Sequence, residues 1–233
     1  PDSVKVINGS AFRNCESLEN VTIGSNSGLC RIEGNAFQKC KVLKEIELPD
    51  TVTYLGSSVF AECDALTDVT LSMGLTGIPS GSFQKCVPLQ KIIIPYRVTG
   101  IGQGAFRKSG AEYVFLPDSV VEIQKDAFAD CQRLKAVLIP ESVRTLGEGI
   151  FRQCMNLGTA MIGSCIERVP DNMFALCARL KNVRIERGVR HIGKSFTGCT
   201  SLEEIEIPDS VETIADFAFS GCSKLKYITL PES

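Results

Sequence analysis

The chain has 233 residues, of which 44% are hydrophobic and 22% charged, and its formal net charge is −2. This balance is typical of a folded globular protein, and the length suits one large domain or two small ones. Because the chain has no basic excess, we expect it to bind neither nucleic acid nor an anionic membrane surface. No apolar run approaches the ~20 residues of a membrane-spanning helix, so we also expect no membrane insertion.

A repeat of about 23 residues organises the sequence. Cysteine stands three residues after nine of the repeated phenylalanines, and leucine stands six residues after the same nine. One such repeat cannot bury its apolar side alone, so we expect stacked repeats to share one continuous core. The phenylalanines recur in ten copies, at Phe12, Phe37, Phe60, Phe83, Phe106, Phe128, Phe151, Phe174, Phe196 and Phe219.

Each repeat predicts three short elements in chain order. The segment from Phe37 to Cys40 is too short for a full helix and suits a helical or 3₁₀ turn. An alternating segment follows at 45–48, which predicts a strand with one buried face, and Pro49 ends it because proline has no amide for a ladder. A return segment closes the repeat, often with a glycine such as Gly102 that permits backbone conformations closed to other residues.

This pattern resembles the leucine-rich repeats of the BspA-like class, also called the Treponema type. The resemblance is carried by the Ala-Phe pair, the cysteine three residues later, the L-x-x-I-x-L-P strand and the V-x-x-I-G return, and it covers the whole chain. It implies a secreted or cell-surface protein, often an adhesin, and it brings no catalytic residues with it.

We therefore predict a right-handed solenoid of the α/β class with about ten coils of ~23 residues. A parallel β-sheet should cover one face, with short helical or 3₁₀ turns opposite. We expect residues 1–233 to form a single leucine-rich-repeat domain and to be a fragment of a longer surface protein.

Nine of the eleven cysteines share one position in the repeat. Their counterparts in neighbouring coils should lie ~4.8 Å apart with parallel side chains, whereas a disulfide needs converging Cβ atoms roughly 3.8 Å apart. We expect buried free thiols that pack as small hydrophobic groups. The chain has no C-x-x-C pair for zinc, and we expect neither a metal nor a cofactor. Cys30 and Cys165 lie outside the shared position and are candidate exposed thiols.

The sequence offers little for catalysis. His191 is the only histidine and falls at a polar return position, so we interpret it as a solvated loop residue. Glu204 and Glu206 should point the same way from one strand and could line a site, although exposed charge on a sheet face is the commoner explanation. We expect no enzymatic activity.

The outward positions of the predicted strands carry the sharpest hypothesis. In each strand the middle residue and the one before the first buried residue should face away from the core. Most of these residues are polar, but four consecutive coils place apolar residues in the middle position and would form a stripe roughly 15 Å long. The candidate partner-binding residues are Ile93, Tyr113, Phe115, Leu138, Met161 and Arg184.

An exposed apolar stripe with a polar rim is a common mark of an interface. We predict an adhesin-like module that binds a protein or glycan through this face. Three alternatives stay open: the stripe is covered by self-association or by a flanking region, it has no role, or the whole array is a structural spacer that displays another domain. A secreted or cell-surface location rests on the resemblance alone.

Overall fold

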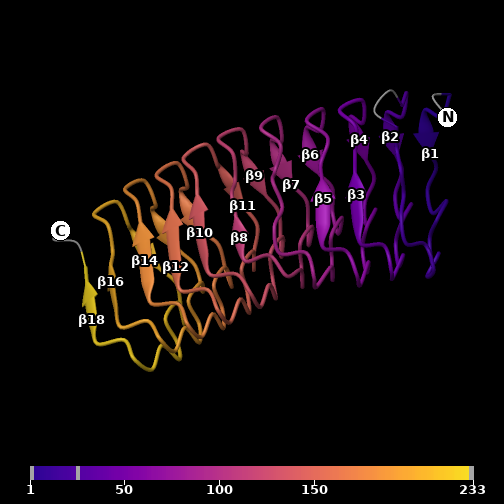
Figure 1. The fold of residues 1–233 in the computed structure, drawn as a ribbon. Helices are drawn as coiled ribbons and strands as arrows, with labels where there is room; N and C mark the ends of the chain where they lie inside the picture. The colour runs from indigo at the N-terminus through magenta and orange to yellow at the C-terminus, as the bar shows by residue number, and fades with distance from the viewer. Residues whose placement is uncertain (1–2, 25–26, 231–233) are drawn as a thin grey trace.

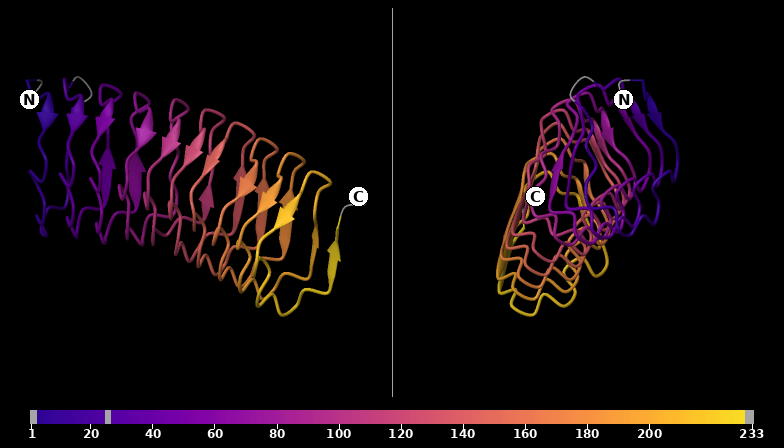
Figure 2. Two further views of the ribbon diagram at one scale, coloured as in Figure 1. Left: turned by 180° about the vertical axis from the view of Figure 1, so that it is seen from behind. Right: turned by 45° about the vertical axis from the view of Figure 1, so that its right-hand side comes forward.

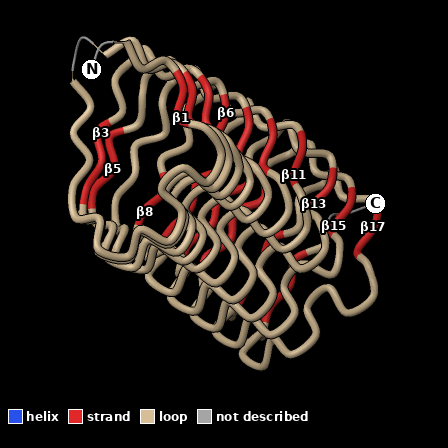
Figure 3. The backbone as a smooth tube through the Cα atoms, turned by 90° about the vertical axis from the view of Figure 1, so that its right-hand side faces the viewer, coloured by secondary structure: helices blue, strands red, loops and turns tan. Residues whose placement is uncertain are grey.

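The computed structural model describes residues 3–24 and 27–230, which form one stack of coils with the chain ends at opposite ends of the stack (Figure 1). Successive coils turn gradually relative to one another along the stack (Figure 2). Parallel strands pair from coil to coil, and these strands fall into two separate columns (Figure 3). The predicted solenoid of about ten ~23-residue coils with a parallel sheet is confirmed.

The first column contains the alternating segments, and we call its outward side the open face. The coil that contains Phe83 has no strand in this column and contributes a parallel bridge between Ile93 and Phe115. The strands are β3 (Glu45–Glu47), β5 (Asp68–Thr70), β8 (Tyr113–Val114), β10 (Ala136–Ile139), β12 (Thr159–Ile162), β14 (Asn182–Ile185), β16 (Glu204–Glu206) and β18 (Tyr227–Thr229).

The return segments also form strands, which the expectation of a sheet on one face did not include. Each is two residues long and pairs in parallel with a neighbouring coil. This return column consists of β1 (Val6–Ile7), β2 (Arg31–Ile32), β4 (Tyr54–Leu55), β6 (Gly77–Ile78), β7 (Gly100–Ile101), β9 (Glu122–Ile123), β11 (Thr145–Leu146), β13 (Arg168–Val169), β15 (His191–Ile192) and β17 (Thr213–Ile214).

The turns around the phenylalanines are not helical, so the expectation of helical or 3₁₀ turns was wrong. Along residues 3–24 and 27–230 there is no helix, and hence none long and apolar enough to cross a membrane. Ser58 and Glu62, two residues before and after Phe60, both have φ near 60°. This left-handed geometry stops a right-handed helix. The amide of Phe60 instead donates to the carbonyl of Ser82 in the next coil at 3.0 Å.

The core is a continuous column of repeated side chains. The ten phenylalanine rings stack face to face, with centroids of neighbouring rings 5.1 to 5.7 Å apart. The nine cysteines at the shared position are free thiols as predicted, and seven of them are buried, whereas Cys15 is exposed and Cys222 is half-buried. The Cys63 thiol donates to the Phe37 carbonyl of the preceding coil at 3.2 Å, and most other cysteines in the column make the same contact. Ser109, which replaces one cysteine, is buried 3.5 Å from the Cys131 sulfur.

Two prolines interrupt the return column. In most coils the residue after the return strand donates its amide to the preceding coil, as Gly102 does to the Ile78 carbonyl at 2.7 Å. Pro79 and Pro170 occupy this position in two coils and have no amide to donate. Among the described strands, β4 does not pair with β6 and β11 does not pair with β13, which are the two places where these prolines stand.

Glycine at this same position serves close packing between coils. A Cβ atom added to Gly102 would lie 2.4 Å from the Ser80 nitrogen, and one added to Gly147 would lie 2.3 Å from the Lys125 nitrogen. Neither glycine has a left-handed φ. The sequence-based expectation that these glycines adopt a backbone conformation closed to other residues was therefore wrong. Glycine is needed here because the neighbouring coil leaves no room for a Cβ atom.

Candidate functional site

The side chains on the open face alternate as expected. In β3, Ile46 is buried while Glu45 and Glu47 on either side are exposed, and β5 repeats this arrangement. Because successive residues of a strand point to opposite faces, the outward set in each coil is the one identified from the repeat. The open face is therefore a surface whose residues change from coil to coil over a constant core.

The predicted apolar residues come together on this face. Ile93 bridges to Phe115, and Leu138 lies opposite Met161 in the pairing of β10 with β12. Ile93 and Phe115 are each 76% exposed and Leu138 is 55% exposed, whereas Met161 is half-buried. We call Ile93, Phe115, Leu138 and Met161 the apolar stripe.

Tyr113 stands at one side of the stripe on β8 and is 47% exposed. The ammonium group of Lys135 lies 5.3 Å from the centre of the Tyr113 ring, and it also pairs with Glu112 at 2.8 Å. That contact raises the pKa of Lys135 and lowers the pKa of Glu112. Cation–π and ionic contacts together hold the ring at the edge of the stripe.

Charged residues flank the stripe at both ends. Exposed Glu45, Glu47 and Asp68 lie on β3 and β5 before it. Arg184 lies directly opposite Met161 after it, and its guanidinium pairs with Glu186 at 2.6 Å. The stripe therefore ends in polar surface on both sides, which is the arrangement expected for the rim of an interface.

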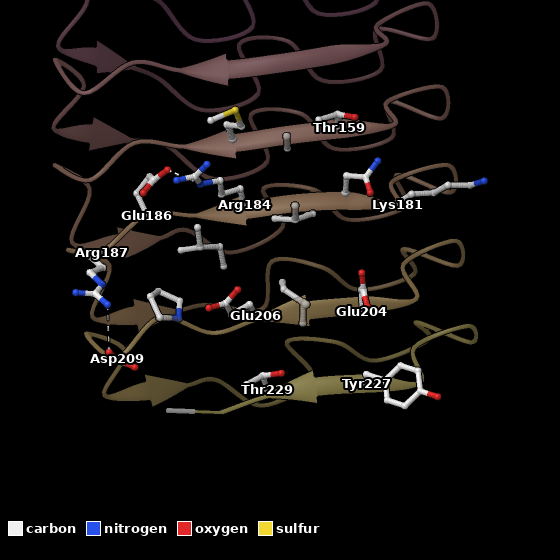
Figure 4. Close-up of a pocket in the computed structure, with 17 residues that line it drawn as sticks. Thr159, Lys181, Arg184, Glu186, Arg187, Glu204, Glu206, Asp209, Tyr227 and Thr229 are labelled. Atoms are coloured by element: carbon white, nitrogen blue, oxygen red, sulfur yellow. Dashed lines mark ion pairs between the residues drawn. The ribbon is translucent and has the colours of Figure 1, made fainter. Parts of the chain in front are cut away.

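An open groove of about 840 Å³, lined in part by Arg184, lies on the same face over β12, β14, β16 and β18 (Figure 4). It falls where β14 and β16 are not joined by strand pairing. Glu204, Glu206 and Tyr227 project along its floor, and Met161 belongs both to this groove and to the stripe. The repeat pattern identified Glu204 and Glu206 as neighbours on one side of a strand but gave no signal for the groove.

The residues considered for catalysis do not converge. His191 lies in β15 of the return column, half-buried rather than in a solvated loop, and its Nδ1 is 2.8 Å from the Thr213 hydroxyl. Glu204 and Glu206 lie in the other column, on β16. Within the described residues, no group of three or more histidine, cysteine or acidic side chains is arranged to hold a metal ion.

The cysteines differ in their access to solvent. Burial raises the pKa of the Cys63 and Cys177 thiols to about 12 and that of Cys40 to about 11. Cys165 is exposed as predicted, but Cys30 is only half-exposed, and its thiol donates to the Lys5 carbonyl at 3.3 Å. Thiolates are the reactive form of cysteine, so the buried thiols are protected both by sterics and by their raised pKa.

Comparison with known proteins places this architecture among bacterial repeat proteins. A family profile described as the BspA type leucine-rich repeat region matches residues 1–112, 99–197 and 193–233. No curated protein matches the chain at a significant level.

Three solved structures are similar over nearly the whole chain. A leucine-rich repeat protein from Bacteroides ovatus has 28% identity and a TM-score of 0.80, with 99% of this chain and 65% of that chain covered. A leucine rich cell surface protein from Faecalibacterium prausnitzii has 30% identity and a TM-score of 0.56, with 100% and 78% covered. The T. pallidum leucine rich repeat protein has 25% identity and a TM-score of 0.60, with 91% and 90% covered.

Proposed function

The chain belongs to the BspA-type leucine-rich repeat family, and we propose from its open face that it is a non-enzymatic module that binds another protein. The apolar stripe forms the centre of the contact, and Tyr113 and Arg184 lie at its edges. This single observation carries the proposal: a contiguous row of three exposed apolar side chains and the half-buried Met161 interrupts a strand face that is otherwise polar.

The fold gives no reason for these residues. Glu47, Thr70, Arg184 and Glu206 occupy the same middle position in other coils, so a polar side chain is compatible with the backbone there. A spacer that binds nothing would have no need of apolar residues confined to consecutive coils. Because exposed apolar patches rimmed by polar residues mark interaction sites, a partner that covers the stripe is the better explanation.

A protein partner fits the stripe better than a glycan does. Phe115, Leu138 and Ile93 offer apolar surface without hydroxyl or amide groups to pair with sugar hydroxyls. Burying a large apolar side chain contributes roughly 1.5–3 kcal/mol. Replacing both Phe115 and Leu138 by serine should therefore weaken binding by about 3 kcal/mol, or ~100-fold.

The test compares the wild type with the Phe115→Ser, Leu138→Ser variant for binding to a panel of purified extracellular matrix proteins by surface plasmon resonance. The matched control carries Thr70→Ser and Thr229→Ser, which change the same middle position outside the stripe. We expect the control to bind as the wild type does and the stripe variant to lose binding, with unchanged denaturation midpoints. Equal affinity of the wild type and the stripe variant would contradict the proposal.

Self-association is the main competing use of the stripe. Light scattering across a range of protein concentrations separates the two, because a copy-to-copy contact would make the wild type associate and leave the stripe variant monomeric. A monomeric wild type that binds a matrix protein through Phe115 and Leu138 supports the proposal. A wild type that binds no partner and stays monomeric favours the spacer.

We also propose that the chain acts at the cell surface or after secretion. The support is the similarity to the Faecalibacterium prausnitzii protein, which is described as a cell surface protein. Fractionation of producing cells, with antibody against this chain, tests the location directly.

A further inference from the structure

Two glycines stand side by side in the return column at a position where every other coil has a side chain. Gly77 in β6 pairs in register with Gly100 in β7. Both precede the buried residue of their strand. The residues at this position in the other eight coils are Val6, Arg31, Tyr54, Glu122, Thr145, Arg168, His191 and Thr213.

Nothing in the fold requires glycine at these two places. A Cβ atom built on Gly100 would have no heavy atom within 4 Å, and one on Gly77 would meet only the Gly100 carbonyl oxygen, at an ordinary 3.7 Å. Neither residue has a left-handed φ. Glycine weakens a strand, so its presence in two adjacent strands points to something that approaches the backbone closely.

The two glycines line a hollow of about 400 Å³, and Tyr54 lines it as well. The guanidinium of Arg31, in the preceding coil, lies 4.0 Å from the centre of the Tyr54 ring and pairs with Glu33 at 2.8 Å. Arg31 therefore covers one face of the ring and leaves the opposite face directed toward the coil of Gly77.

Backbone acceptors also open onto the hollow. Because Pro79 has no amide, the Leu55 carbonyl lacks the partner that this carbonyl position has in most coils, and β4 and β6 do not pair within the described chain. Thr53 and Leu55 both line the hollow. Ser57 and Ser80, which carry hydroxyl groups, also line it.

We propose that this hollow is a second binding site, separate from the open face, and that it takes a neutral sugar ring of a glycan. The free face of Tyr54 supplies a flat apolar surface for the ring, and the absence of side chains at Gly77 and Gly100 supplies the space. Sugar hydroxyls donate to the Leu55 and Thr53 carbonyls and exchange hydrogen bonds with Ser57 and Ser80. An apolar side chain of a protein partner would leave these acceptors unpaired, which is unfavourable. An anionic ligand would find Arg31 already engaged by Glu33.

The experiment exposes the wild-type chain to a printed panel of neutral oligosaccharides that contain hexose and N-acetylhexosamine units, and then measures the dissociation constant for the best glycan by titration. Tyr54→Ala should weaken binding at least ten-fold, while Tyr54→Phe should keep it because the ring remains. Gly100→Thr, which installs the residue found at 145 and 213, should also weaken binding at least ten-fold. Thr145→Val is the matched control at the same position outside the hollow and should bind as the wild type does.

The Gly100→Thr variant separates a binding role from a structural one. We expect its denaturation midpoint to be equal to or above that of the wild type while its affinity falls. A lowered midpoint would show that the glycine serves the fold and would overturn the proposal. The proposal would also be overturned if the wild type bound no oligosaccharide, or if Tyr54→Ala left the affinity for the glycan unchanged. The Phe115→Ser, Leu138→Ser variant should retain glycan binding, so failure here is distinct from failure of the open-face proposal.

Discussion

Gly100 and Gly102 lie two residues apart on one return segment, and we predict that alanine has opposite effects at the two positions. A Cβ atom at Gly100 enters open space. One at Gly102 would lie 2.4 Å from the Ser80 nitrogen and 2.7 Å from the Pro79 carbonyl carbon, both in the backbone of the preceding coil. Comparing the two positions therefore separates the steric role of glycine from the free-energy cost of its conformational freedom in the unfolded chain.

The sizes of the two effects follow from these contacts. Replacing glycine by alanine where the backbone accepts it stabilises a protein by roughly 0.4–1 kcal/mol, because the unfolded chain loses freedom. Gly100→Ala should therefore raise the free energy of unfolding by about this amount. At Gly102 the added Cβ atom would clash with backbone atoms, and no side-chain rotation relieves such a clash. The two coils must therefore move apart, which weakens the hydrogen bond that the Gly102 amide donates to the Ile78 carbonyl. Overpacking of this kind costs about 1–3 kcal/mol, and we expect Gly102→Ala to fall at the upper end.

Urea denaturation followed by far-ultraviolet circular dichroism measures both variants against the wild type. A solenoid need not unfold in one step, so the free energies should be compared only if the slopes of the transitions agree. We expect a higher midpoint for Gly100→Ala and a lower one for Gly102→Ala. A shift of the same sign for both variants would refute the assignment of Gly102 to close coil packing.

Three further predictions concern the core and the return column. Phe128→Ala should cost about 3–5 kcal/mol of unfolding free energy, and Phe12→Ala much less, because Phe128 is fully buried between two rings whereas Phe12 is 40% exposed and stacks on one. The folded chain holds the pKa of buried thiols at about 11 for Cys40 and about 12 for Cys63, so unfolding releases protons once the pH passes their ordinary value of 9.0. The contribution of these thiols to stability should therefore be constant below pH 9 and fall as the pH rises from there toward 12, which denaturation at fixed pH values measures. Pro79→Gln should increase hydrogen-exchange protection around β4 and β6, because it restores an amide that can bond to Leu55, and unchanged exchange there would contradict the explanation of the break.

The core could be predicted from the sequence because every coil repeats it. The spacing of Phe37, Cys40 and Leu43 alone predicts which side chains are buried, and all three are fully buried in the structure. The outward direction of Ile93 and Phe115 follows from the same repeat, since a strand residue between two buried ones must face away from the core. Repetition thus determines both the buried set and the exposed set.

The turns and the second column were harder to predict for physical reasons. A segment such as 58–62 has a left-handed residue at each end without glycine, and its amides bond to the next coil, so no local pattern distinguishes it from a short helical turn. The return strands are two residues long, too short for a recognisable alternation. The breaks at Pro79 and Pro170 could be seen in the sequence, because proline stands where neighbouring coils donate an amide. This signal can be interpreted only once the return segments are known to be strands.

The residues that vary between coils carry what the fold itself does not determine. A solenoid is stable when equivalent core positions stack, and this leaves the outward positions free to differ. The apolar stripe and the pair Gly77 and Gly100 are each confined to consecutive coils. Each is therefore a local feature of the surface and is not required by the repeat. Substitutions at these positions should therefore change binding more than stability, whereas substitutions at the stacked phenylalanines should do the reverse.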